Sequence, residues 1–371
     1  MRAAAGPVAL TGGPDTVVLD LGHEHPAAHG SIELALTVDD GHVVSADPGI
    51  GFMHRGAEKL FEARDYRQIL MLANRHDWQA AFAGELGVAL AVERMLGLDV
   101  PPRAVWLRTL CAELTRITSH LAYLGAAPLA AGYLAPALGA RDAVQSALEE
   151  FSGGRVHYML TKVGGLREDI PPGWTASCRW ALAAVRDALP AVADFLGGEA
   201  VRAATRGIGT LTRADALAFG VSGPVARASG LDLDLRRDDP YLAYADLGVR
   251  VVTRAAGDCA ARWICLYDQV TESVRLAEQC LTRLPAGAVA ARTAKVVRAP
   301  EGACYVWTES PLGISGVYLV SRGKPTPWRL KLRTPSFSNV AALTAILPGT
   351  ALDDVASVLA SVFFVAGDLD R

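Results

Sequence analysis

The sequence is poor in the features that bind clusters, nucleotides or nucleic acids. Its six cysteines are scattered, and no two of them form a Cys-x-x-Cys pair. The chain alone therefore lacks the closely spaced thiolates that hold an iron–sulfur cluster, and we expect the isolated chain to carry neither a cluster nor a flavin. No Gly-x-Gly-x-x-Gly segment follows a predicted strand, so the dinucleotide-binding fingerprint is absent. The formal net charge is −3, which excludes the strongly basic footprint of a nucleic-acid-binding protein.

Disulfides and a leader segment are also not indicated. Six cysteines in 371 residues do not suggest a disulfide framework and favour a reducing compartment. Residues 1–13 have too short an apolar run, and too much Gly and Pro, for a signal peptide. Charged residues make up 20% of the chain and hydrophobic residues 51%. This balance is typical of an Ala-rich helical core or of a subunit whose surface is partly covered by partners.

One stretch is long enough to span a bilayer. Residues 117–140 contain no Asp, Glu, Lys or Arg, and about 20 apolar residues suffice to cross a membrane. The stretch also contains Pro128 and Pro136 together with three glycines, which break helices. We therefore predict a helix end, a loop and a new helix start, buried in the protein.

Helical periodicity dominates the middle of the chain. Three-four spacing of apolar residues predicts long helices over residues 65–97, 102–124, 173–196 and 258–284, with a shorter one over residues 141–151. Strand-like alternation around an Asp39-Asp40-Gly41 turn precedes them, and strands with short helices follow. The predicted fold class is α+β, mainly α: a helical-bundle core with a small N-terminal antiparallel β unit and a C-terminal β-containing segment. We place the boundaries of these units at residues 1–55, 56–290 and 291–371.

Two clusters of side chains are candidates for chemistry. The segment from Gly22 to Gly30 contains His23, His25 and His29. These histidines are compatible with a metal site, with a proton donor to a bound oxygen ligand, or with ordinary backbone hydrogen bonds. In the helix over residues 102–124, Glu113, Arg116 and His120 share one face; there we favour a surface or interhelical ion pair.

Several segments together resemble one family, in its order and over nearly the whole chain. They include His25-Pro26-Ala27-Ala28-His29-Gly30, His54-Arg55-Gly56-Ala57-Glu58-Lys59, Val100-Pro101-Pro102-Arg103-Ala104, Asp234-Leu235-Arg236-Arg237 and Gly367-Asp368-Leu369-Asp370-Arg371. The chain resembles the D-type subunit, also called the 49 kDa-type subunit, of respiratory complex I, the proton-translocating NADH:quinone oxidoreductase. That family is related to the large subunits of nickel–iron hydrogenases, whose two Cys-x-x-Cys pairs are missing here, so a metal site of that kind is excluded.

The resemblance implies a function in a membrane-bound complex. The B-type subunit, which carries the terminal iron–sulfur cluster, and the C-type subunit would be the chief partners, together with the membrane arm. Quinone would be the substrate, no cofactor or metal would be bound by this chain alone, and the NADH would be oxidised elsewhere in the complex. The location would be the cell membrane, peripheral, on the cytoplasmic side.

The resemblance also implies roles for single residues. His29 would be the catalytic proton donor, and His25, His29 and Trp78 would bind the quinone. Arg55 and His157 would lie within reach of each other near the partner's cluster. A cation and an ionisable imidazole there would raise the reduction potential of the cluster and couple its reduction to protonation.

The sequence departs from the family where quinone would bind. Trp78 stands where the family has a quinone-binding Tyr, and Ala130 and Phe363 align with two family Asp residues. Indole keeps an N–H donor but lacks the acidic hydroxyl. Two alternatives therefore stay open: a divergent structural subunit that keeps the fold and the partner interface but reduces no quinone, and a stand-alone metalloenzyme using His23, His25 and His29.

Overall fold

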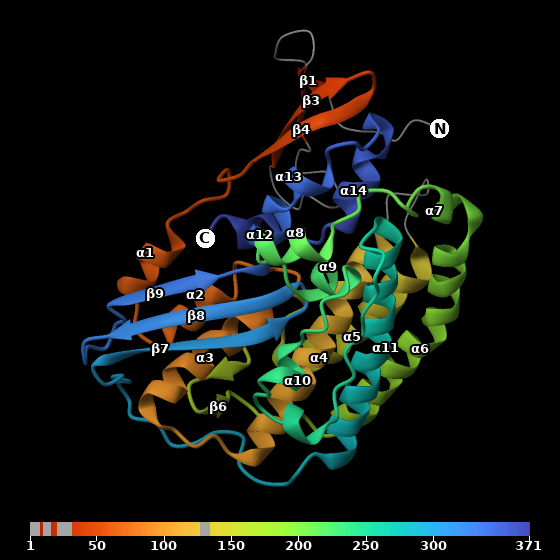
Figure 1. The fold of residues 1–371 in the computed structure, drawn as a ribbon. Helices are drawn as coiled ribbons and strands as arrows, with labels where there is room; N and C mark the ends of the chain where they lie inside the picture. Colours follow the sequence, from red (N-terminus) through yellow and green to blue (C-terminus); the bar gives the residue numbers. More distant parts are fainter. Residues whose placement is uncertain (1–7, 10–15, 21–31, 127–133) are drawn as a thin grey trace.

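The structure of the protein, a computed structural model, describes residues 8–9, 16–20, 32–126 and 134–371 (Figure 1). Its first unit is an antiparallel sheet in the order β1 (Val8–Ala9), β2 (Thr16–Asp20), β3 (Glu33–Asp39) and β4 (His42–Gly49). Asp40 and Gly41 connect β3 to β4 with φ angles of 44° and 73°. Two-residue hairpins favour this left-handed conformation, and the predicted hairpin is confirmed.

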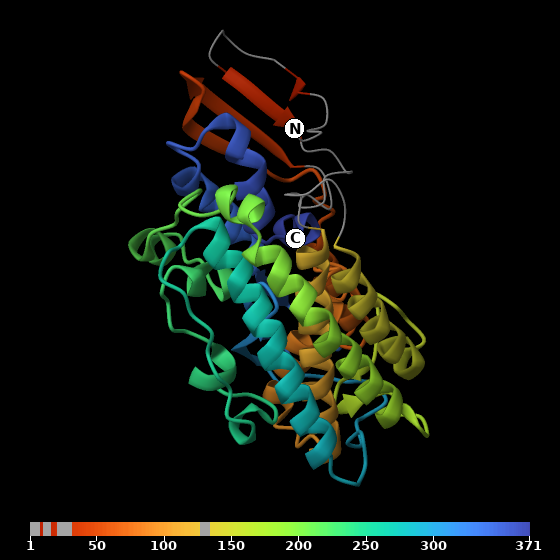
Figure 2. The same ribbon diagram turned by 90° about the vertical axis from the view of Figure 1, so that its right-hand side faces the viewer.

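Four long helices pack side by side as the core of the molecule (Figure 2). They are α4 (Pro102–Gly125), α5 (Ala135–Ser152), α6 (Trp174–Gly197) and α11 (Cys259–Arg283). Helix α4 contacts α5 and α11, and α6 contacts the same two helices from the other side. The apolar seam predicted for α4 is at most 1% exposed at each of its positions: Leu107, Leu110, Leu114, Ile117, Leu121 and Leu124. The mainly helical fold class is confirmed.

A second sheet lies beside the bundle (Figure 1). Its strands β7 (Gly302–Ser310), β8 (Gly313–Ser321) and β9 (Arg329–Arg333) are antiparallel in that order. Helix α3 (Ala81–Leu96) packs against β7 and β8, α1 (Ala57–Glu62) against β9, and α2 (Gln68–Ala73) against α3. Buried Val88, Val317 and Leu319 belong to the apolar core that these elements share.

Short elements connect these layers. Strands β5 (Thr161–Lys162) and β6 (Gly165–Leu166) form a small hairpin between α5 and α6. Residues 199–246 contain α7 (Glu199–Ala203), α8 (Arg213–Ala218), α9 (Gly223–Ala228), α10 (Leu235–Asp238) and the 3-10 turn η1 (Tyr244–Asp246). The tail contains α12 (Pro335–Ala341), α13 (Leu343–Ile346), η2 (Leu352–Asp354), α14 (Val355–Ser361) and α15 (Ala366–Leu369). The division into three units at residues 55 and 290 stays a prediction.

The structure corrects the expected helix over residues 65–97. That stretch is broken between α2 and α3, and Trp78 lies in the connecting segment instead of on a helix face. Oδ1 of Asp77 accepts hydrogen bonds from the backbone N–H groups of Gln79 and Ala80, both at 3.0 Å. A side-chain oxygen that binds nearby backbone N–H groups favours a turn over a continued helix. The membership of the bundle also differs from the prediction. Helix α3 packs against the second sheet, and α5, which is longer than predicted, is the fourth helix of the bundle.

The ion pair predicted at Glu113 and Arg116 exists, but it is buried inside the protein. Both side chains are at most 1% exposed, and they lie 3.4 Å apart on α4. Glu113 also binds Arg236 at 3.1 Å, and Arg236 binds Asp234 at 2.7 Å. His120 lies nearby with Nε2 at 2.9 Å from the Pro311 carbonyl. A chain of alternating charges therefore crosses the interior between α4 and the segment around α10.

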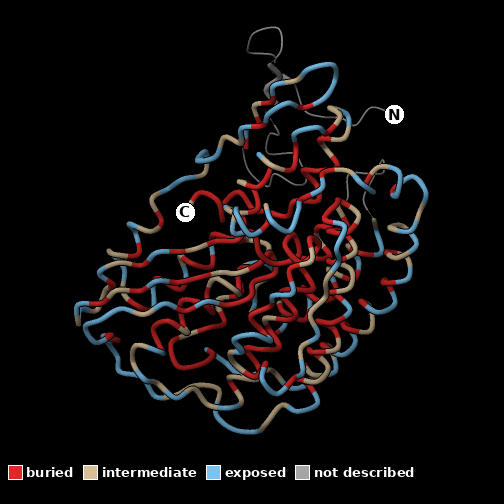
Figure 3. Tube along the Cα trace, viewed as in Figure 1, coloured by how far each residue is buried: buried red, intermediate tan, exposed pale blue. Residues whose placement is uncertain are grey.

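The stretch without charged residues is not one continuous helix. Helix α4 ends at Gly125 and α5 begins at Ala135, as the prolines and glycines predicted. Among the described residues, no helix is both long and apolar enough to cross a membrane. The buried residues instead concentrate where the bundle and the second sheet meet (Figure 3).

Candidate functional site

The segment between α2 and α3, residues 74–80, brings two predicted site residues together. The Arg55 guanidinium donates a hydrogen bond to the Arg75 carbonyl at 2.8 Å. The His157 imidazole is hydrogen-bonded to the backbone of Asn74. Arg55 and His157 are 102 positions apart in the sequence, yet they bind adjacent residues of one segment and their charges influence each other.

The surroundings of His157 keep its ring uncharged at neutral pH. Burial lowers the pKa of His157, and the positive charges of Arg75 and Arg55 lower it further, against the hydrogen bond with Asn74. Nδ1 of His157 is buried and has no hydrogen-bond partner within the described part of the chain. Arg55 and Arg75 are exposed. Arg55 and Arg75 thus present two positive charges at this surface, and Nδ1 of His157 is buried next to them.

Glu85 on α3 links Asn74 to the chain segment that follows His157. Its carboxylate accepts hydrogen bonds from the backbone N–H groups of Met159 at 2.7 Å and Thr161 at 3.0 Å. It also accepts a hydrogen bond from the side-chain amide of Asn74. Glu85 is 1% exposed, and burial raises its pKa to about 7, against these hydrogen bonds. The segment that carries His157 is therefore fixed to Asn74 through one buried carboxyl group.

We expect Glu85 to make stability depend on pH. Its folded-state pKa of about 7 lies above the ordinary 4.5, so its contribution is fully present below pH 4.5 and is lost as pH rises through 7. Since one pKa unit corresponds to about 1.4 kcal/mol, the loss is on the order of 3 kcal/mol. Glu85→Gln should remove this part of the pH dependence. Urea unfolding of both proteins between pH 5 and 8 measures it, and a stability difference that does not change with pH would contradict the assignment.

Trp78 lies against the C-terminal segment. The glycine at position 367 makes this contact possible, because a Cβ there would meet Trp78 Cζ3 at 2.2 Å and the His76 carbonyl at 2.6 Å. The indole is half-buried and packs against the bundle core. Trp78 therefore lies on the same short segment that binds Arg55 and His157.

Residues 367–371 form a part of the site that sequence reasoning missed. The Asp370 carboxylate accepts hydrogen bonds from the backbone N–H groups of Gly51 and Met53, both at 2.8 Å. Arg371 lies 3.6 Å from Glu58, so both residues hold the turn that carries Arg55. The sequence of this segment helped to carry the family resemblance, but nothing in it indicated that it folds beneath Trp78.

The remaining predicted residues lie elsewhere. His23, His25, His29 and Ala130 are outside the described residues, so of the predicted quinone-binding residues only Trp78 is described. Phe363, which aligns with a family Asp, is fully buried. Its ring meets the rings of Tyr123 and Trp263 edge-on, with centroids 5.2 Å and 5.4 Å away. This position is an aromatic core site that offers no ionisable group.

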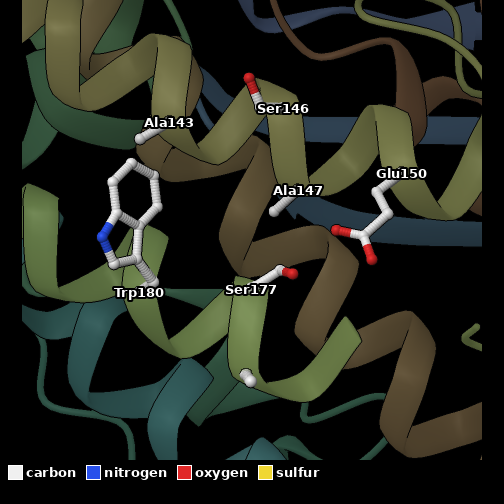
Figure 4. A pocket seen from close by; sticks show the side chains of 7 residues that line it. Ala143, Ser146, Ala147, Glu150, Ser177 and Trp180 are labelled. Atoms are coloured by element: carbon white, nitrogen blue, oxygen red, sulfur yellow. The ribbon is translucent and has the colours of Figure 1, made fainter. Parts of the chain in front are cut away.

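A groove on the bundle is separate from this segment. A groove of about 420 Å³ between α5 and α6 is lined by residues including Ala143, Ala147, Ser177 and Trp180 (Figure 4). None of Arg55, Trp78 or His157 lines it. Within residues 32–126 and 134–371, no three His, Cys, Asp or Glu side chains are grouped closely enough to hold a metal ion.

Comparison with known families identifies the class of this protein as a subunit of a respiratory oxidoreductase. The sequence profile of the family described as "Respiratory-chain NADH dehydrogenase, 49 Kd subunit" matches residues 130–300 and 292–371. The chain belongs to this family, the D-type subunits of complex I, as the sequence resemblance indicated.

Similar proteins span almost the same length. The D 2 subunit of the NADH-quinone oxidoreductase of Salinispora tropica is 57% identical over 361 residues, which cover 96% of this chain and 93% of the relative. The corresponding D 1 subunit of Streptomyces coelicolor is 56% identical over 364 residues, covering 96% and 95%. The D subunit of the enzyme from Geobacillus thermodenitrificans is 36% identical over 361 residues, covering 96% and 99%.

Proposed function

We propose that this chain forms the quinone site of a proton-translocating NADH:quinone oxidoreductase together with a B-type subunit that carries the terminal iron–sulfur cluster. The observation that carries the proposal is that Arg55 and His157 bind two adjacent residues, Arg75 and Asn74. The segment with these two residues also contains Trp78. In this proposal the C-type subunit and the membrane arm are further partners. The complex lies at the cell membrane, with this chain peripheral on the cytoplasmic side.

Quinone is the proposed substrate, and this chain alone binds no cofactor or metal. Reduction places negative charge on two carbonyl oxygens, each of which needs a hydrogen-bond donor that can also give a proton. We assign one of these roles to His29, we assign His25 to quinone binding, and we assign Trp78 to the other end of the quinone. The indole can donate a hydrogen bond there, but it is far too weakly acidic to deliver a proton.

Arg55 and His157 act on the partner's cluster in this proposal. A cation near a cluster stabilises the extra electron and raises the reduction potential. His157 is neutral at pH 7 because burial and the arginine charges lower its pKa. Negative charge that arrives on a nearby cluster raises the proton affinity of the ring, so cluster reduction and proton uptake at His157 are coupled.

The reduction potential of the cluster in the assembled complex tests these roles. Arg55→Met should lower the midpoint potential by tens of millivolts, which corresponds to a charge interaction on the order of 1 kcal/mol for a one-electron couple. His157→Met should flatten the dependence of that potential on pH. The controls are Arg213→Met, at an exposed residue of α8, and His42→Met, at an exposed residue of β4, which should change neither quantity. Potentials that match the wild type in both site variants would refute the assignment.

A divergent structural subunit is the second candidate, and two residues support it. Trp78 lacks an acidic group, and Phe363 is part of a closed aromatic cluster. Such a subunit keeps the fold and the partner interface but reduces no quinone. The rate of quinone reduction by the complex separates the two candidates.

A further inference from the structure

A small cavity lies behind the segment that carries Trp78. Its volume is about 30 Å³, and since one ordered water molecule needs roughly 10–15 Å³ of such space, it has room for one or two. His76, Asp77 and Asp368 contribute polar side chains to its wall, and Val317 and Leu332 contribute apolar ones. The cavity thus lies between the 74–80 segment, the C-terminal segment and strands β8 and β9.

The two carboxyl groups at this cavity have different backbone contacts. Oδ1 of Asp77 is occupied by the N–H groups of Gln79 and Ala80, both at 3.0 Å. Oδ2 of Asp368 accepts a longer hydrogen bond, at 3.4 Å, from the N–H group of Ser336. Asp77 and Asp368 are 9% and 5% exposed. Both carboxyl groups are therefore largely removed from water while they lie at one cavity.

The two arginines whose charges act on Asp368 form their hydrogen bonds with other groups. Arg333 donates hydrogen bonds to the carbonyl groups of Ile314 and Gly220. Arg371 donates to the Thr334 hydroxyl at 3.1 Å and lies near Glu58. These guanidinium groups act on Asp368 only through their charge.

A polar atom without a partner also belongs to the cavity. His76 is 4% exposed and lines the same wall. Its ring is hydrogen-bonded to the backbone of Gly367, but Nε2 is buried without a partner among the residues that the structure describes. A buried ring nitrogen of this kind usually binds an ordered water molecule. The cavity therefore has a nitrogen and two carboxyl groups with which one water molecule can form hydrogen bonds.

The charges around the cavity favour a proton on the carboxyl pair. Burial and the charge of Asp368 raise the pKa of Asp77 well above its usual range. Burial raises the pKa of Asp368 to about 6, although Ser336, Arg371 and Arg333 oppose this. Burial and the charge of Arg55 lower the pKa of His76 to about 4, so its ring is neutral. The other ionisable groups facing the cluster are Glu58, which acts on His76, and Tyr123, whose hydroxyl is bonded to the Phe364 carbonyl.

We propose that Asp77 and Asp368 share one proton at neutral pH, and that a water molecule bound between them and His76 lets the pair pass this proton towards a quinone beside Trp78. The last part rests on the proposed function. The contacts of Trp78 support it, because Trp78 follows Asp77 in the chain and lies over Gly367, which precedes Asp368.

One proton moves to one of the two quinone oxygens in this step, and His29 is the proposed donor to the other oxygen. The partner's iron–sulfur cluster supplies two electrons, one at a time, and the reduced quinone oxygen takes up a proton. The O–H bond of the carboxyl pair breaks, water carries the proton, and a new O–H bond forms on the quinone oxygen. The pair is left with two negative charges, which repel each other in a buried site. It therefore takes a proton back from solvent before the next turnover.

Infrared spectroscopy of the full chain tests the shared proton without any need for quinone. The difference spectrum between the wild type and Asp368→Asn should contain the carbonyl stretch of a protonated carboxyl at pH 7, and contributions from Glu85 cancel in it. Each of Asp77→Asn and Asp368→Asn should lower the pH at which the remaining carboxyl ionises, by about one unit or more, because the neighbouring charge is gone. Asparagine keeps the oxygen that accepts the backbone hydrogen bonds at each position, so both variants should fold.

Asp258→Asn is the matched control. Asp258 is also buried and also accepts hydrogen bonds from backbone N–H groups, those of Gly207 and Ala261 at 2.8 Å. This substitution should leave the protonated-carboxyl band of the pair unchanged. Absence of the band from the wild type at pH 7, or equal ionisation in the wild type and both pair variants, would overturn the shared proton.

Activity of the assembled complex tests the donor role separately. Asp368→Asn should slow quinone reduction by roughly tenfold at pH 7, with a larger loss at higher pH, where solvent protons are scarcer. An infrared titration as expected, together with an unchanged rate and pH profile in Asp368→Asn, would refute the donor role and leave the shared proton standing. If the wild-type complex reduces no quinone at all, the proposed function and the donor role fail together, and the infrared result still decides the shared proton.

Discussion

Replacing Trp78 by tyrosine should raise the rate of quinone reduction by the assembled complex about a hundredfold. A proton donor positioned at the reacting group typically contributes a factor of about 10² or more. The indole N–H can donate a hydrogen bond but cannot give up its proton, whereas the tyrosine hydroxyl can do both. The native complex should therefore reduce quinone slowly, although the Asp77–Asp368 pair lies close by.

The contacts of Trp78 show why this substitution can be accommodated. The indole lies over Gly367 and is half-buried, so a smaller phenol ring fits the same space and leaves room for its hydroxyl. Tyrosine would also stand next to the carboxyl pair, which can return a proton to it. We therefore expect Asp368→Asn to remove most of the gain when it is combined with Trp78→Tyr.

Steady-state quinone reduction with NADH as donor provides the measurement. Trp180→Tyr is the matched control, because Trp180 is 67% exposed in the groove between α5 and α6, and it should not change the rate. Fast reduction by the wild-type complex that Trp78→Tyr leaves unaltered would show that this position does not limit proton delivery.

The helices of the bundle could be predicted from sequence because their pattern is local. Apolar residues at steps of three and four fix the buried face of a helix, and α4, α6 and α11 appear within a few residues of the expected bounds. The break before α3 could not be found in this way. It depends on the Asp77 side chain binding the N–H groups of Gln79 and Ala80, which competes with an equally plausible helical pattern.

Of the site, only the residues that the family resemblance named could be predicted from the sequence. Arg55 and His157 do meet at one segment, whereas their roles stay predictions. The scaffold around them was missed, because Glu85, Asp370 and Arg371 contact it from distant parts of the chain. The burial of Glu113 and Arg116 could not be predicted for the same reason. In the sequence they resemble a surface pair on α4, but Arg236, more than a hundred residues later in the chain, binds Glu113 inside the protein.

That buried cluster should show the largest effect on stability. Glu113 binds Arg236 at 3.1 Å and Arg116 at 3.4 Å, and it accepts a hydrogen bond from the Tyr244 hydroxyl at 2.6 Å. Burial alone would raise the pKa of Glu113, but Arg236 and Arg116 lower it to about 2. Removing one member of a buried charge pair leaves its partner uncompensated, which costs about 3–5 kcal/mol.

Glu113→Gln should therefore lower the free energy of unfolding by about 3–5 kcal/mol at pH 7, although the side chain keeps its size. Because the folded-state pKa of Glu113 is depressed, its contribution is present above pH 4.5 and is lost as pH falls towards 2. The difference between the two proteins should begin to shrink below pH 5. Urea unfolding of the full chain at several pH values measures it. The control is Glu62→Gln, since Glu62 binds the exposed Lys59 at 2.6 Å and such a surface pair contributes at most about 1 kcal/mol. Equal losses in the two variants would mean that the buried cluster does not stabilise the fold through its charges.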